Sequence, residues 1–139
     1  NQDFRNLKND YKYDFIILDA PCSSVGTIRK NPEIFYKNKE PNFNNLLKIQ
    51  KLMLQKAASI LNNNGIILYM VCSFLKIETL DQIDFFLKQN KNFFLYNFNE
   101  DNKNIFTKNL INNNLMITVP TKIGEHGIDG YFSAYLKKN

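Results

Sequence analysis

Hydrophobic stretches alternate with polar, amide-rich stretches along the 139-residue chain, and their lengths separate strands from helices. Two continuous apolar runs, 13–20 and 66–71, are typical of buried parallel strands. Apolar residues at helical spacing predict helices over 42–62 and 78–89, the second with an acidic first turn. Shorter runs predict further strands at 93–98, 115–119 and 130–136.

This order of elements predicts an α/β fold that forms the second half of a Rossmann-like, doubly wound sheet. We expect a mostly parallel sheet with an antiparallel final strand. The segment 62–65, Asn-Asn-Asn-Gly, predicts the end of the first helix, since both residue types tolerate left-handed backbone. The connection 21–41 is long enough to be functional. The polar segment 99–114 predicts irregular structure with a helical turn near Phe106.

Each of the two cysteines follows one of the strong strands, Cys22 after 13–20 and Cys72 after 66–71. Ligands of open α/β sheets bind outside the carboxyl ends of the strands, so both thiols and Asp19 should face one crevice. A thiol where a strand leads into a helix is a candidate nucleophile, because helix amides lower its pKa. The competing interpretation is a buried cysteine that only packs. An acid that ends a buried run needs partners, which favours a site role for Asp19.

Composition limits the possible classes of protein. Hydrophobic residues make up 44% of the chain, with 12 Phe and 7 Tyr, which predicts a globular domain. We expect no membrane span, because apolar runs stay well short of about 18 residues, and no signal peptide is visible. The absence of zinc-like Cys/His spacing predicts that no metal is bound. Two free thiols at strand ends fit a reducing compartment, hence a cytoplasmic protein.

The net charge of +5 permits a polyanionic partner such as RNA, although frequent Lys and Asn are also typical of AT-rich coding sequence. Arg29 and Lys30, in the long connection, are the candidate contacts to RNA phosphate. With only 5 Gly, the chain has no glycine-rich turn between a strand and a helix. Either the half of the sheet that binds a nucleotide-like cofactor is not in this chain, or no such cofactor is bound.

Five segments together resemble one family in order and spacing: 19–26 (DAPCSSVG), 28–34 (IRKNPEI), 71–73 (VCS), Glu78 and 127–132 (GIDGYF). The family is the RNA 5-methylcytosine methyltransferases that use S-adenosylmethionine, and the chain most resembles its bacterial branch that acts on 16S ribosomal RNA. The resemblance implies that Cys72 is the nucleophile and that Cys22 helps to release the product. It places Asp19 at the junction of cofactor and target base.

The resemblance also implies that residues 1–139 are part of the catalytic domain. The cofactor-binding half and an RNA-binding domain would then precede Asn1. We therefore expect an exposed strand edge at 13–20, a tendency to aggregate, and weak binding of S-adenosylmethionine by these residues alone. Two alternatives remain open at this point. One is a DNA cytosine-C5 methyltransferase with Cys22 as nucleophile, against which the second cysteine motif argues, and the other is a non-catalytic RNA-binding fragment.

Overall fold

The computed structural model describes residues 3–8, 10–36, 39–96, 111–112, 114–123 and 126–139. The helices are α1 (Phe43–Ile60) and α2 (Leu80–Gln89). The strands are β1 (Tyr13–Asp19), β2 (Leu61–Val71), β3 (Phe93–Leu95), β4 (Ile111–Asn112), β5 (Leu115–Ile117), β6 (Thr121–Ile123), β7 (His126–Ile128) and β8 (Phe132–Lys138). Short 3-10 helices lie at Phe4–Asn6, Val25–Thr27, Pro32–Tyr36 and Lys76–Glu78.

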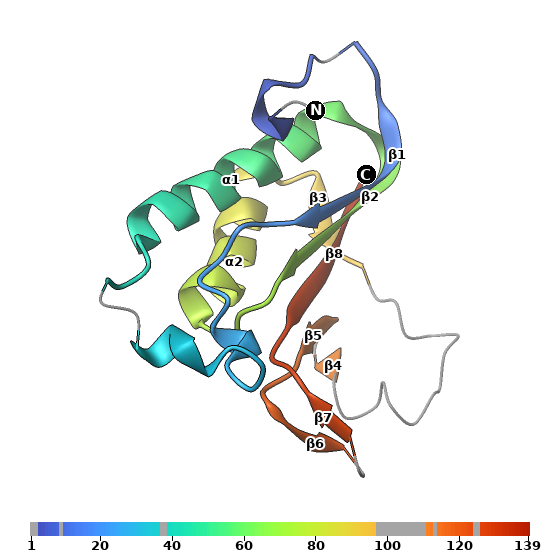
Figure 1. Cartoon of the computed structure of the whole chain (residues 1–139). Coiled ribbons are helices and arrows are strands. Elements are labelled where there is room, and N and C mark those ends of the chain that lie inside the picture. Colours follow the sequence, from blue (N-terminus) through green and yellow to red (C-terminus); the bar gives the residue numbers. More distant parts are fainter. Residues whose placement is uncertain (1–2, 9, 37–38, 97–110, 113, 124–125) are drawn as a thin grey trace.

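One sheet organises the fold, with strand order β1-β2-β8-β5-β4 and β3 also paired to β8. β1 and β2 are parallel neighbours, with Ile17 opposite Leu68 and Asp19 opposite Met70. β8 is antiparallel to β2, β3 and β5, so those three and β1 run one way and β8 runs the other. Figure 1 shows β8 beside β2, within the sheet. The predicted α/β fold with an antiparallel final strand is confirmed.

The core lies between the sheet and two helices that cover the same face of it (Figure 1). Every second side chain of β2 points into this core, where Ile67, Tyr69 and Val71 are fully buried. They belong to one apolar cluster with Leu54 of α1 and Ile83 of α2. The alternation arises because successive side chains of a strand point to opposite faces.

The opposite face of the sheet is open, which corrects the prediction of a fully buried strand at 13–20. Tyr13, Phe15 and Ile17 of β1 are 44%, 49% and 60% exposed. Phe15 lies beside Ile66 and Ile17 beside Leu68, so the apolar surface continues onto β2. Parallel strands are buried on both sides only where helices cover both faces. Within the described ranges, α1 and α2 cover only one, and β1 is the end strand of the sheet, so the expected exposed edge is confirmed.

The first helix begins and ends close to its predicted bounds, but the segment after it differs. Asn42 caps the start of α1 by accepting a hydrogen bond from the Asn45 N–H at 3.0 Å. Segment 62–65 lies inside β2 and is not a turn. Asn64 does adopt left-handed backbone, with φ 61°. Leu61 already pairs with Tyr13, and the next pair along is Phe15 with Ile66. Segment 62–65, which includes Asn64, is therefore the place where the register between β1 and β2 shifts, and it does not separate two elements.

The remaining elements differ mainly in length. β3 ends at Leu95, β8 runs to Lys138, and α2 begins two residues after the predicted 78. The hairpin of β6 and β7 is not predicted by the sequence pattern. The turn expected near Phe106 lies outside the described residues.

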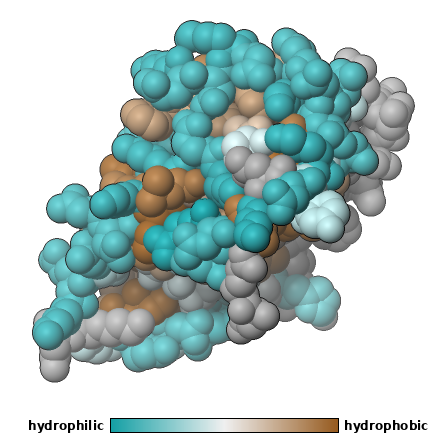
Figure 2. Space-filling model, turned by 90° about the horizontal axis from the view of Figure 1, so that it is seen from above, coloured by the Kyte–Doolittle hydropathy of each residue, from teal (hydrophilic) through white to brown (hydrophobic). Residues whose placement is uncertain are grey.

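The surface is largely hydrophilic when the molecule is seen from above, with hydrophobic residues gathered in patches (Figure 2). Besides β1, the 3-10 helix Pro32–Tyr36 carries exposed aromatic residues, with Phe35 72% and Tyr36 83% exposed. None of the helices in the described ranges is long and apolar enough to cross a membrane.

Candidate active site

The two thiols meet where β1 and β2 end. These strands are parallel neighbours, so their carboxyl ends lie at the same edge of the sheet. The Sγ atoms of Cys22 and Cys72 are 3.2 Å apart, and both cysteines are free and partly buried. The expected convergence of the two cysteine motifs is thus confirmed in geometry.

Backbone hydrogen bonds fix the loop that carries Cys22 against its neighbours. The Gly26 N–H donates to the Cys72 carbonyl at 3.0 Å, and the Gly130 N–H donates to the Gly26 carbonyl at 2.7 Å. A Cβ atom at position 26 would lie 1.9 Å from the Gly130 oxygen, so only glycine fits there. Ser24 adopts left-handed backbone, with φ 61°, and its Oγ lies 3.4 Å from Cys72 Sγ.

The contact between the sulfurs makes the two thiols unequal. The hydrogen bond between the two thiols, supported by the one between Cys72 and the Ser24 hydroxyl, lowers the pKa of Cys72 to about 6 against the opposing effect of burial. The same contact, together with burial, raises the pKa of Cys22 far above its ordinary value. These opposite shifts favour Cys72 as the thiolate and nucleophile, with Cys22 as its hydrogen-bond donor.

This inequality predicts a pH profile for alkylation. The rate of Cys72 carboxamidomethylation by iodoacetamide should rise with pH to a plateau, with a midpoint near the pKa of about 6. Cys22→Ala removes the main hydrogen-bond donor, so the midpoint should rise toward about 8.5, the ordinary thiol pKa. Peptide mass spectrometry separates the two cysteines in the wild type. An unchanged midpoint in Cys22→Ala would show that the contact does not set the Cys72 pKa.

Asp19 is exposed at the end of β1, next to this thiol pair, and its negative charge opposes ionisation of Cys72. Within the described residues its carboxylate has no hydrogen-bond or ion-pair partner, so it remains available to a ligand. The described residues contain no group of three potential metal ligands. For a nucleotide-like cofactor they supply this one carboxylate but no glycine-rich turn after a strand, so they fit only part of such a site.

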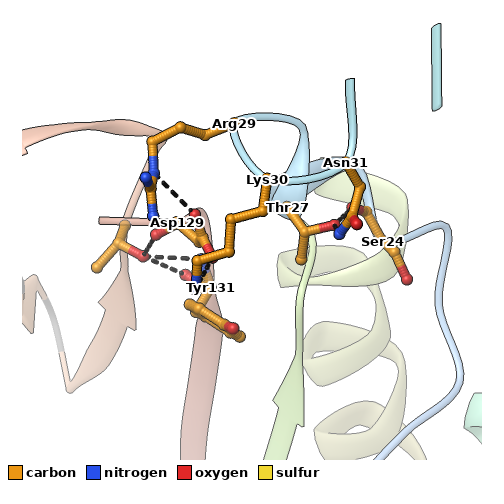
Figure 3. Close-up of polar contacts among 8 residues, drawn as sticks. Ser24, Thr27, Arg29, Lys30, Asn31, Asp129 and Tyr131 are labelled. Atoms are coloured by element: carbon orange, nitrogen blue, oxygen red, sulfur yellow. Dashed lines mark hydrogen bonds and ion pairs between the residues drawn. The ribbon is translucent and has the colours of Figure 1, made fainter. Parts of the chain in front are cut away.

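Arg29 and Lys30 lie together on Asp129, which the sequence analysis does not identify as a site residue. Arg29 Nε and Lys30 Nζ each lie 3.0 Å from a different oxygen of this buried carboxylate (Figure 3). Lys30, and to a smaller extent Arg29, hold the pKa of Asp129 below its ordinary value. The three residues line a cavity of about 360 Å³ together with Tyr131, Met116 and others.

Two further buried residues, Glu78 and Gln50, contact the Cys22 loop, and neither had a predicted role, although Glu78 is one of the segments that carry the family resemblance. Glu78 is predicted in the acidic first turn of the second helix, but it lies before α2 and is fully buried. Gln50 is predicted on the inner, mostly apolar face of a helix, where it indeed lies. The signal for Gln50 was a polar residue at an inward helical position, and the signal for Glu78 was its place in the family resemblance.

Comparison with known proteins identifies the family. A family model described as 16S rRNA methyltransferase RsmB/F matches residues 1–137. Ribosomal RNA small subunit methyltransferase B of Pasteurella multocida is 42% identical over 79 residues, which cover 57% of this chain and 18% of that protein. The protein of the same name from Shewanella oneidensis is 40% identical over 76 residues, covering 55% and 18%. The matched part of the chain thus spans less than a fifth of these relatives' length.

Solved structures show a similar fold. The crystal structure of PH0851 superposes with a TM-score of 0.71 at 32% identity, covering 90% of this chain and 26% of that one. The structure of NSun6 from Pyrococcus horikoshii with SFG gives a TM-score of 0.72 at 22% identity, covering 99% and 33%, and shows likeness of fold. Because the family model spans nearly all of the sequence, the chain belongs to the 16S rRNA methyltransferase RsmB/F family.

Proposed function

We propose that this chain transfers a methyl group from S-adenosylmethionine to carbon 5 of a cytosine in RNA, specifically ribosomal RNA, through a covalent cysteine–cytosine adduct. The observation that carries the proposal is the pair of unequal thiols, 3.2 Å apart, at the ends of adjacent parallel strands. Family membership supports RNA as the substrate and S-adenosylmethionine as the methyl donor. Reduced thiols at the site support a cytoplasmic location.

In the proposed mechanism the Cys72 thiolate adds to carbon 6 of the base, which makes carbon 5 enamine-like and nucleophilic. S-adenosylmethionine supplies the methyl group that carbon 5 takes up. Carbon 5 then loses its proton to solvent, the carbon 5–carbon 6 double bond re-forms, and the electrons of the carbon–sulfur bond leave on Cys72. The Cys22 thiol can donate a hydrogen bond to that leaving sulfur, so the contact that lowers the Cys72 pKa also makes Cys72 a better leaving group.

We assign RNA contacts to the surface beside the thiols. Arg29 and Lys30 share one carboxylate, so the cluster that they form with Asp129 keeps a net positive charge toward phosphate. The exposed rings of Phe35 and Tyr36 lie on the same long connection and suit stacking on unpaired bases. A target base has to leave its stack before a thiol can reach carbon 6, which favours single-stranded RNA.

We further propose that residues 1–139 are one part of a methyltransferase domain and that the rest of this domain covers the open face of β1. The apolar side chains of that face, Tyr13, Phe15 and Ile17, support this proposal. Asp19 would lie at the boundary between the cofactor and the base, since it is the free carboxylate at the end of the same strand. We expect these residues alone to bind S-adenosylmethionine weakly.

Release of tritium tests the position of methylation. With the full polypeptide that contains these residues, RNA carrying [5-³H]cytosine should release one tritium to water for each methyl group incorporated, because carbon 5 loses its hydrogen. The same RNA carrying [6-³H]cytosine is the matched control and should keep its label. Methyl incorporation without tritium release would contradict the carbon-5 assignment. Equal activity on DNA of the same sequence would contradict RNA as the substrate.

A further inference from the structure

Glu78 is a buried carboxylate that contacts the residue next to Cys22. Its Oε1 accepts a hydrogen bond from the Ser23 N–H at 2.8 Å, and its Oε2 accepts one from the Ser23 hydroxyl at 2.6 Å. Its side chain is fully buried, and burial of a carboxylate is costly without such partners. The Tyr69 hydroxyl also donates to the Glu78 carbonyl at 2.9 Å, which fixes the backbone of Glu78 on the core strand β2.

Gln50 of α1 holds the other side of Cys22. Its Nε2 donates to the Pro21 carbonyl at 2.9 Å and lies 3.4 Å from Glu78 Oε1. The residues on both sides of Cys22 are thus fixed by buried polar side chains from two different elements. A buried network of this kind, in which most groups are satisfied, gives a loop one defined position.

The two cysteines depend on this network to different degrees. Cys72 directly follows β2, which is paired on both sides by β1 and β8 and holds its position through the sheet. Cys22 belongs to no strand or helix, so its sulfur is positioned by the contacts of Pro21, Ser23 and Gly26. Loss of the Glu78 contacts should therefore move Cys22 and leave Cys72 in place.

We propose that Glu78 is a positioning residue that acts through Ser23 to hold the Cys22 thiol against the Cys72 sulfur, and that it thereby promotes release of the product more than attack on the base. The part that concerns release rests on the proposed function. The part that concerns the two sulfurs does not, and it can be measured without RNA or methyl donor.

Formation of a disulfide between Cys22 and Cys72 measures how well the two sulfurs are positioned. In a buffer of oxidised and reduced glutathione, Cys72 attacks the glutathione disulfide and Cys22 then displaces the second glutathione from Cys72. Two protein thiols lose two electrons to form one disulfide, and one oxidised glutathione becomes two reduced ones, which take up the two protons. The equilibrium constant of this exchange measures how well the two sulfurs are held together.

We expect Glu78→Ala to lower this constant by about tenfold or more, since small displacements cost reactive groups heavily. Glu78→Gln should stay within about threefold of the wild type, because its amide can still accept from the Ser23 N–H and can donate to the Ser23 hydroxyl. Gln82→Ala is the matched control: Gln82 is buried on α2, and its side chain donates to the Ile77 carbonyl and not to the Cys22 loop. It should leave the constant unchanged.

The second readout is catalytic, with target RNA and S-adenosylmethionine at pH 8.5, where a large share of Cys72 is ionised even with an ordinary thiol pKa. Glu78→Ala should accumulate the covalent protein–RNA species on a denaturing gel, and Glu78→Gln should not. If Glu78→Ala does not fold, Ser23→Ala removes only the hydroxyl contact and should shift both readouts in the same direction by a smaller amount.

The two readouts separate the two claims. The positioning role of Glu78 would be overturned if both Glu78→Ala and Ser23→Ala left the equilibrium constant of the glutathione exchange unchanged. It would also be overturned if Gln82→Ala lowered this constant as much as Glu78→Ala does. Glu78→Ala could lower the equilibrium constant of the glutathione exchange without accumulating the covalent protein–RNA species. If Cys22→Ala does accumulate that species, this result would overturn the link between Glu78 and product release. If Cys22→Ala itself traps no RNA, the proposed function fails at Cys22, while the glutathione measurement still decides the role of Glu78 in positioning.

Discussion

Cys72→Ala is expected to abolish methyl transfer while RNA binding stays within about threefold of the wild type, because the thiol makes its bond only along the reaction path. Loss of a nucleophile lowers turnover on the order of 10⁴-fold or more. The side chain is small and partly exposed at a strand end, so its removal should not disturb the fold. Incorporation of labelled methyl groups measures the turnover, and filter binding of RNA measures the affinity. Both are measured on one preparation.

Ser73→Ala is a suitable control for this first prediction. Ser73 is the adjacent residue and is buried, and its hydroxyl accepts a hydrogen bond from the Leu75 N–H. It should keep measurable turnover if the loss in Cys72→Ala is chemical and not a consequence of a disturbed loop. Methyl transfer by Cys72→Ala at more than about a hundredth of the wild-type rate would exclude Cys72 as the nucleophile.

The second large effect is expected for Cys22→Ala, which should accumulate a covalent protein–RNA species. Attack by Cys72 persists, but the leaving sulfur no longer receives the hydrogen bond of the neighbouring thiol at 3.2 Å, so release stalls. Turnover should stop after about one methyl group per protein, since the adduct is not resolved. A denaturing gel with labelled RNA shows the species as a band of reduced mobility.

The double variant provides the control for this band. Cys22→Ala combined with Cys72→Ala should show none, because no nucleophile remains. The outcome that would reverse the roles is a shifted band in Cys72→Ala together with none in Cys22→Ala. That result would favour the alternative of a DNA cytosine-C5 methyltransferase, in which Cys22 is the nucleophile.

The hydrophobic pattern is sufficient to predict the two strong strands and the first helix, and hence the meeting of the thiols. Runs such as 66–71 are long and unbroken, and parallel neighbours end at one edge by rule. What the pattern could not show is pairing between distant residues. Glu78 contacts Ser23, 55 positions away, and Asp129 contacts Arg29 over 100 positions, and no local periodicity encodes either pair. The short strands β4, β6 and β7 carry too few residues for a period to be recognised.

The open face of β1 shows a second reason why the sequence pattern does not predict the whole structure. A continuous apolar run predicts burial on both sides, but burial depends on what packs against the strand and not on the strand itself. Ile17 is 60% exposed although its sequence neighbours Ile16 and Leu18 are buried. The apolar run 13–20 therefore fits a strand whose exposed side chains need a second layer of protein to cover them.

The place of β8 in the sheet has a consequence for how the protein is made. Although β8 is the latest strand of the sequence, it lies between β2 and β5. A chain that stops at residue 131 lacks the strand that joins these two parts, so its sheet cannot close. Gly130, which ties down the Cys22 loop through Gly26, lies just before this strand. Interrupted synthesis or proteolysis ahead of Gly130 should therefore leave products with unpaired strands and a Cys22 loop without its Gly130 contact, which suit removal by quality-control proteases.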